Sequence, residues 1–194
     1  MTNLPKLFDI ITGTMKLDDF YDKIKNVQAP EEEVFGYVTG TCEIGNDEKT
    51  GHRVTMWTIK FLNRKLHHFY GSNMETLLKN GKLQVIDANA FRNDKEPLYQ
   101  KGDLIYNKKT NKCSIIMKVC DSNNDNNNDN NDDYVRKGKE HSKHWYMIAS
   151  PGQKNELLSE TFIIYATKHN ILEVHKKRSV EECLSLAKDL SNED

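Results

Sequence analysis

The sequence predicts an α+β protein in which antiparallel β-strands dominate. Three observations lead to this fold class. Short segments rich in β-branched and aromatic residues follow one another along the middle of the chain, clusters of Gly, Asn, Asp and Ser separate them, and both ends carry apolar residues at helical spacing. Short strands with turns between them are typical of antiparallel sheets and barrels. We therefore expect a β-rich body with helices at its two ends.

A β-hairpin is the clearest predicted element. Residues 34–44 read VFGYVTGTCEI, residues 45–51 form a turn cluster, and residues 52–62 read HRVTMWTIKFL. β-Branched and aromatic residues on both sides of a polar, Gly-containing turn are the pattern of two antiparallel strands. A further strand at residues 65–70 extends the hairpin to a three-stranded sheet. We call its second and third strands, with the turn between them, the 52–70 meander.

Both ends of the chain predict helices. At the N-terminus, two apolar stripes predict a pair of short helices, within an extension over residues 1–30 that packs on the body. Gly13 separates the stripes, which comprise Leu4, Leu7, Phe8 and Ile11, and then Leu17, Phe20, Tyr21 and Ile24. At the C-terminus, Ser179-Val180-Glu181-Glu182 matches a capping box and predicts the start of an amphipathic helix.

Residues 31–194 are predicted to form a single β-rich domain. A capping box at Ser72–Glu75 predicts a short helix that ends at Asn80-Gly81. Further strands are predicted at residues 82–90, 103–107, 112–119, 144–149, 161–167 and 171–175. A loop over residues 121–140 interrupts the domain. Residues 121–133 are all Asn or Asp except Ser122, and a segment with nothing apolar to bury is expected to be disordered.

The predicted strands suggest an antiparallel β-barrel or a strongly bent sheet. Pleckstrin-homology-like and lipocalin-like barrels also place a helix after their last strand, so the architecture is similar to theirs. The similarity concerns architecture alone, because a fold does not determine a function.

No segment of the sequence predicts a secretory or membrane destination. The first 20 residues lack an apolar core of the length that a secretory signal needs, and no run approaches 18 apolar residues. The four cysteines are too scattered for a disulfide framework. We expect no transmembrane segment and a location in the cytoplasm or the nucleus.

The sequence carries no recognisable catalytic motif. The glycine spacing after residue 36 matches neither a dinucleotide fingerprint nor a phosphate-binding loop. The side chains of Cys113, Cys120, His141 and His144 are types that bind zinc, but Cys-x6-Cys is not the spacing of a zinc knuckle. We predict no catalytic residue, no metal and no cofactor, although a site that assembles only in three dimensions is compatible with the sequence.

The 52–70 meander combines basic and aromatic side chains. Residues 34–120 hold 14 Lys and Arg against 8 Asp and Glu, a net charge of +6, and such a surface attracts anions. The candidate ligand-binding residues are Arg53, Trp57, Lys60, Arg64, Lys65, His67 and His68. A competing interpretation places Trp57 in the core, because aromatic residues of strands usually pack inward.

These observations predict a non-enzymatic binding or scaffolding module. We expect it to engage a protein partner or an anionic ligand, such as a phosphoinositide, through the meander or through an exposed strand edge. The first alternative is a β-barrel that binds single-stranded nucleic acid by stacking bases on exposed aromatic rings. The second alternative is an enzyme whose site is not visible in the sequence.

Overall fold

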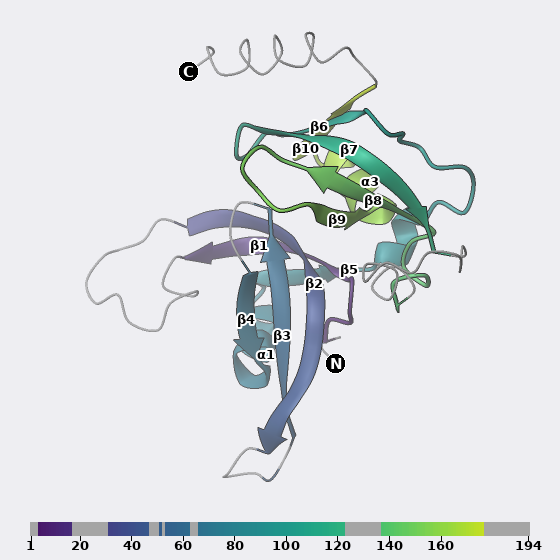
Figure 1. Ribbon diagram of the computed structural model, residues 1–194. Helices are drawn as coiled ribbons and strands as arrows, with labels where there is room; N and C mark the ends of the chain where they lie inside the picture. Colours follow the sequence, from purple (N-terminus) through teal and green to yellow (C-terminus); the bar gives the residue numbers. More distant parts are fainter. Residues whose placement is uncertain are drawn as a thin grey trace. The chain divides into compact units, whose positions relative to one another are not determined.

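A computed structural model of the protein describes residues 4–16, 31–46, 51, 53–62, 66–122 and 137–176. The chain divides into two compact units, Met1–Asp87 and Ala88–Asp194. Each unit has its own five-stranded antiparallel sheet and its own helix packed on that sheet (Figure 1).

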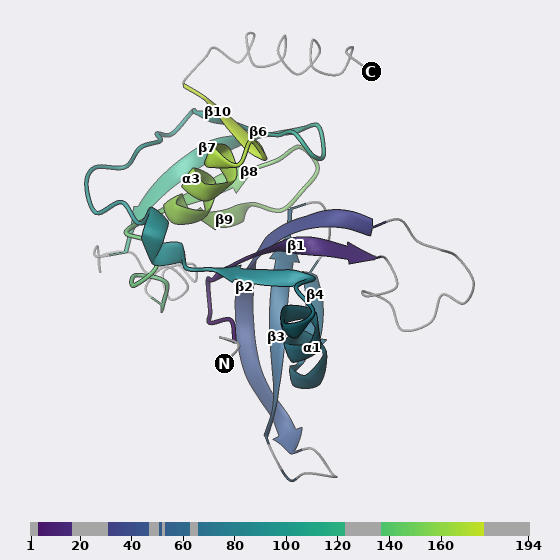
Figure 2. The same cartoon turned by 180° about the vertical axis from the view of Figure 1, so that it is seen from behind.

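In the first unit, a four-stranded meander is followed by a helix and a fifth strand. The strands lie in the order β4-β3-β2-β1-β5, so β5 returns to pair with β1 at the end of the sheet. The elements are β1 (Ile10–Lys16), β2 (Glu31–Asn46), β3 (Arg53–Phe61), β4 (Leu66–Tyr70), α1 (Gly71–Lys79) and β5 (Leu83–Ile86). Helix α1 packs against β3, β4 and β5 on one face of the sheet (Figure 2).

The core of the first unit lies between the sheet and α1. Three alternate residues at the end of β3, Trp57, Ile59 and Phe61, contribute to this core, since successive side chains of a strand point to opposite faces. The cluster comprises Ile11, Met15, Val34, Val38, Trp57, Ile59, Phe61, Phe69, Met74, Leu77 and Leu83, all buried. The intervening side chains, such as Thr58 of β3 and His68 of β4, therefore lie on the face opposite α1.

The second unit also contains a meander, a helix and a returning strand. Its order is β10-β6-β7-β8-β9, and β10 pairs with β6. The elements are η2 (Ala88–Phe91, a 3-10 helix), β6 (Leu104–Asn107), β7 (Lys112–Asp121), β8 (His144–Ala149), β9 (Glu156–Ser159), α3 (Glu160–Lys168) and β10 (Leu172–His175). Helix α3 lies across one face of the sheet (Figure 2) and buries Phe162, Ile163 and Ala166.

The predicted barrel or strongly bent sheet, whether pleckstrin-homology-like or lipocalin-like, is wrong. Within the described residues the strands form two separate five-stranded sheets, and neither closes into a barrel. The prediction treated all strands as one series. It had no means of detecting that β5 pairs back to β1, which ends the first sheet before β6 begins the second. The expected antiparallel pairing is confirmed.

The first predicted N-terminal helix is also wrong. Residues 10–16 form β1, which pairs with β2 on one side and with β5 on the other. The helical spacing of apolar residues is interrupted at Phe8, whose φ of 69° belongs to the left-handed region. Ile11 and Met15 lie four residues apart, and this spacing places two residues on one face of a strand as well as on one face of a helix.

The predicted strand at residues 161–167 is a helix. Ser159 caps α3 by accepting a hydrogen bond from the Phe162 backbone N–H at 3.2 Å. The segment is short and apolar on nearly all sides, and periodicity cannot separate a buried helix of this kind from a buried strand. Strand β9, which precedes the helix, was not predicted.

The hairpin of β2 and β3 is confirmed, and so is the short helix α1, which ends at Lys79, directly before Asn80-Gly81. The capping box is not formed, because the residue that precedes α1 is Tyr70 and Ser72 lies inside the helix. Residues 17–30, 123–136 and 177–194 lie outside the described part of the chain. The remainder of the second N-terminal helix, the disorder of the 121–140 loop, the boundary at residue 30 and the C-terminal helix therefore stay predictions.

Candidate functional site

Trp57, the aromatic centre of the predicted site, belongs to the core. It is 5% exposed, and its indole Nε1 donates a hydrogen bond to the Pro5 carbonyl at 2.8 Å. Both its apolar ring and its single polar atom are thus engaged inside the first unit. An indole in this position cannot serve as a platform on which a nucleic-acid base stacks.

The basic residues of the meander do not form one cluster. Arg53 is exposed, but its guanidinium contacts the Glu43 carboxylate at 2.7 Å, so a negative charge already compensates it. Lys60 is half-buried, and it lies beside Leu66 across the β3–β4 ladder. Arg64 and Lys65 lie outside the described residues. The structure therefore does not bring the cationic candidates together on one described surface.

The two histidines lie on opposite faces of β4. His67 faces the α1 side, where its ring centroid is 5.9 Å from that of Phe61. His68 is exposed on the other face, and its Nδ1 is 3.0 Å from the Thr58 hydroxyl. His68 is thus exposed, whereas His67 is half-buried.

His68 lies between two large apolar side chains on the face of β4 opposite α1. Leu66 is 52% exposed and Tyr70 is 48% exposed. Since alternate residues of a strand share a face, Leu66, His68 and Tyr70 form one exposed line, which we call the β4 strip. The residues of β3 beside the strip are Lys60, Thr58 and Met56. Among these six side chains Lys60 carries the only permanent charge, a composition typical of the centre of a protein–protein interface.

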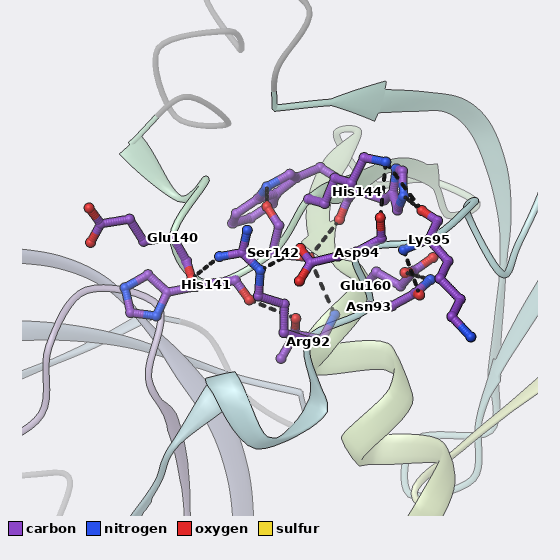
Figure 3. A network of polar contacts seen from close by, with 12 residues as sticks. Arg92, Asn93, Asp94, Lys95, Glu140, His141, Ser142, His144 and Glu160 are labelled. Carbon is purple, nitrogen blue, oxygen red and sulfur yellow. Dashed lines mark hydrogen bonds and ion pairs between the residues drawn. The ribbon is translucent and has the colours of Figure 1, made fainter.

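A buried polar network in the second unit is the other candidate site. Its centre is Glu160, the first residue of α3, which is fully buried. One carboxylate oxygen accepts hydrogen bonds from the Leu98 backbone N–H at 2.8 Å and from the Tyr146 hydroxyl, and the other accepts from Asn93 Nδ2 at 2.7 Å. Figure 3 shows Asn93 and Glu160 within this network.

The environment of Tyr146 keeps its hydroxyl protonated. Burial raises the pKa of Tyr146 well above its ordinary value, and the hydrogen bond to the Glu160 carboxylate raises this pKa further. The hydroxyl thus remains a donor to Glu160 while it accepts a hydrogen bond from the Tyr99 backbone N–H at 3.3 Å. A tyrosine with a raised pKa is a poor general base or nucleophile, so these contacts support a structural role.

The other members of the network fix the backbone of residues 92–100. His144 Nε2 is hydrogen-bonded to the Lys95 carbonyl at 2.7 Å, and Lys143 Nζ donates to the carbonyls of Asp94 and Lys95. Arg92 donates to the Glu140 carbonyl (Figure 3). Because Lys143 and His144 bond backbone carbonyls of this surface loop, these contacts hold the loop in place.

Sequence reasoning missed Glu160 and Tyr146. The available signal was a single carboxylate inside the apolar run LLSETFIIYA. A charged residue in such a run is expected to find polar partners when it is buried. The sequence gives no indication that those partners come from residues 93, 98 and 146.

The zinc candidates do not converge. Cys120 is buried and Cys113 is half-buried. Within the described ranges, no group of three or more His, Cys, Asp or Glu side chains is arranged to hold a metal ion.

A helix long and apolar enough to cross a bilayer is not found among the described residues.

The β4 strip and the Glu160 network thus differ in what they offer. The strip exposes apolar and aromatic side chains, whereas the network satisfies its own polar groups internally. No protein-family model, no curated protein and no solved structure matches this chain.

Proposed function

We propose that this protein is a non-enzymatic binding module that engages a protein partner through the β4 strip. The observation that carries the proposal is the exposed line of Leu66, His68 and Tyr70 on the face opposite α1. Apolar and aromatic side chains on a charge-poor sheet face are the groups that contribute most to protein binding. We place the encounter in the cytoplasm or nucleus, as the sequence predicts.

An anionic ligand is supported less well than a protein. Arg53 is already paired with Glu43, and Lys60 is the only lysine or arginine beside the strip among the described residues. A phosphoinositide headgroup needs several converging cations. Single-stranded nucleic acid also needs exposed aromatic rings, and the burial of Trp57 removes the ring for which that alternative was proposed.

Enzymatic activity has no specific support in the described residues. The Glu160 carboxylate accepts hydrogen bonds from Asn93, Leu98 and Tyr146. The other buried carboxylates among the described residues, Asp9 and Asp103, accept from the backbone N–H groups of Lys6 and Gln100. A general acid or base must reach the proton of a substrate. We therefore retain binding as the proposed function.

Affinity purification with quantitative mass spectrometry tests this proposal. The bait is the full chain as wild type, as the Leu66→Asp/Tyr70→Asp double variant, and as Met117→Asp. Met117 is a matched control because its side chain is 42% exposed and it belongs to the other sheet. We expect at least one protein to be retained by wild type and by Met117→Asp, and to be lost with the double variant.

Two results would contradict the β4 strip as the binding surface. In the first, the double variant retains every protein that the wild type retains. In the second, an Arg53→Glu variant abolishes binding to phosphoinositide vesicles or to single-stranded DNA at low salt, while the double variant binds them normally. The second result would favour an anionic ligand.

A further inference from the structure

We infer that the chain is a tandem duplication of one structural unit. Both units consist of a four-stranded meander, a nine-residue helix that starts directly after the fourth strand, and a four-residue strand that pairs with the first strand. This correspondence pairs β1 with β6, β2 with β7, β3 with β8, β4 with β9, α1 with α3, and β5 with β10.

The strand registers agree residue by residue. Ile11 lies opposite Gly36 and Val85, and its counterpart Ile105 lies opposite Ser114 and Val174. The third and fourth strands agree as well. Four cross-strand pairs of β3 and β4 recur in β8 and β9, among them Trp57 with Phe69 and Tyr146 with Leu158.

An irregularity of the ladder recurs at the equivalent position. The register between β2 and β3 shifts after the pair Val38–Ile59, and the register between β7 and β8 shifts after the pair Ile116–Ile148. A five-stranded sheet does not need a bulge at this point. Bulges persist among related proteins because they direct the strand, so a shared bulge supports a common origin.

The turn before the first strand is built in the same way in both units. In the first unit, the Asp9 carboxylate accepts from the Lys6 backbone N–H at 2.7 Å, and the Asp9 N–H donates to the Lys6 carbonyl. In the second unit, Asp103 and Gln100 make the same two bonds, with the carboxylate contact at 2.9 Å.

The residue before each aspartate shares a further feature. Phe8 and Gly102 both have a positive φ, and their N–H groups donate to the carbonyls of Val38 and Ile116. Non-glycine residues with positive φ are uncommon. The agreement thus extends to a backbone conformation that topology alone does not require.

The two helices also end alike. The Lys82 N–H donates to the Leu77 carbonyl, and the Ile171 N–H donates to the Ala166 carbonyl. The carbonyls of Lys82 and Ile171 then accept from the backbone N–H groups of Thr14 and Lys108 respectively, just beyond the last shared pair of the first strand.

Some equivalent positions also hold the same amino acid. These positions are Leu4/Leu98, Asp9/Asp103, Ile11/Ile105, Cys42/Cys120, Ile59/Ile148, Lys79/Lys168, Leu83/Leu172 and Val85/Val174.

The duplication gives a reason for the Glu160 network. Trp57 and Tyr146 are equivalent, and each holds the segment that leads into the first strand: Trp57 bonds the Pro5 carbonyl, and Tyr146 bonds the N–H of the equivalent residue, Tyr99. Gly71 occupies the position of Glu160. The second unit thus holds its lead-in segment with a tyrosine and a carboxylate where the first unit uses an indole.

A graft within the full chain tests the inference. In the in-register graft, the sequence of residues 168–175 replaces residues 79–86, which retains Leu83 and Val85 and places Asn at the positive-φ position of Gly81. In the shifted graft, residues 169–176 replace residues 79–86 and put Glu at position 83, where Leu83 is 1% exposed. A one-residue slip exchanges the two faces of a strand.

We expect the in-register graft to keep the amide protection of β1 against hydrogen exchange and to melt within about 5 °C of wild type. The shifted graft should lose that protection. The reciprocal graft, in which residues 79–86 replace residues 168–175, should likewise preserve the protection of β6. Loss of protection in both in-register grafts, to the extent seen in the shifted graft, would overturn the duplication. Neither graft alters the β4 strip, so failure here is distinct from failure of the proposed function.

Discussion

The Glu160 side chain is fully buried, so its carboxylate has no contact with solvent. Three hydrogen-bond donors of the protein replace water and stabilise the buried carboxylate. The Leu98 N–H, the Tyr146 hydroxyl and the Asn93 amide all point at its carboxylate. The loss of such an acceptor is more costly than the loss of an exposed one, because buried donors remain without a partner. The residue therefore matters for folding even though it is not proposed to act on a ligand.

Replacement of Glu160 by Ala is expected to lower the free energy of unfolding by about 2–5 kcal/mol. Urea denaturation followed by circular dichroism measures this change. Glu140→Ala is the control, because Glu140 is exposed and interacts with Arg92 through its backbone carbonyl. A Glu160 variant as stable as the control would show that the network does not hold the fold.

Tyr146 predicts a specific loss of stability in alkali. Its pKa is raised in the folded state by burial and by Glu160, relative to an ordinary value of 10.0. Above pH 10 the unfolded chain therefore releases a proton that the folded chain keeps, so this contribution to stability is complete below pH 10 and falls as the pH rises beyond it.

The urea midpoint of wild type should thus fall more steeply above about pH 10 than that of Tyr146→Phe. Below that pH the two midpoints should differ by a constant amount. Tyr99 and Tyr165 also have raised pKa values, but they are present in both proteins. Parallel curves across pH 10 would refute the assignment to Tyr146.

The tryptophans offer a simple optical test of the core. Trp57 is 5% exposed and Trp145 is fully buried, with its Nε1 bonded to the Ser142 carbonyl at 3.2 Å. Iodide quenches indoles that it can contact, so the native Stern–Volmer slope should be severalfold below that of the protein in urea. A native slope close to the unfolded one would place an indole at the surface and revive the stacking hypothesis.

At the scale of elements, β2 shows how a backbone contact constrains a strand. A Cβ atom on Gly36 would lie 2.3 Å from the Lys60 carbonyl oxygen, whereas a Cβ on Gly40 would meet nothing closer than the Thr58 side chain at 3.8 Å. The same strand thus contains one glycine required by close packing and one that is not.

We expect Gly36→Ala to destabilise the protein by more than about 2 kcal/mol, and Gly40→Ala to change stability by less than about 1 kcal/mol. Thermal unfolding of the two variants gives the comparison directly. Equal effects would mean that β2 and β3 do not approach each other as closely at Gly36 as the structure shows.

Elements with strong local signals were predicted from the sequence, and elements defined by distant partners were not. The β2–β3 hairpin has β-branched residues around a polar turn, and α1 ends at Asn80-Gly81 as expected. Strand β1 and helix α3 were misassigned because their short apolar patterns fit either conformation. Pairing with β2 and β5 determines β1, and packing against sheet residues such as Tyr146 determines α3.

At the scale of the whole molecule, the repeated unit was invisible in the sequence. Few equivalent positions share a residue, and the spacing between equivalents changes along the chain because the connections differ in length. Residues 47–52 join β2 to β3, whereas residues 122–143 join β7 to β8 and include most of the Asn/Asp-rich segment. The correspondence between the two units is visible in the hydrogen-bond registers of their sheets, although most side chains at equivalent positions differ.

The candidate site could be predicted only in part. The sequence pointed to the 52–70 meander, and the β4 strip lies within it, but the sequence could not show which face of β4 is open. Trp57 is buried in the core beneath α1, and Arg53 is paired with Glu43, so neither base stacking nor a cluster of cations explains the site. The exposed side chains are those of Leu66 and Tyr70. Those two residues were not among the predicted site residues.

The two-unit architecture depends most on the return of the last strand of each unit to the first. Backbone nuclear Overhauser effects in the labelled full chain test this directly. We expect cross-strand contacts between Ile11 and Val85 and between Ile105 and Val174, the equivalent pairs of the two sheets. If either pair lacks these contacts, or if β5 instead pairs with β6 in one continuous sheet, the two-unit architecture and the duplication are both contradicted.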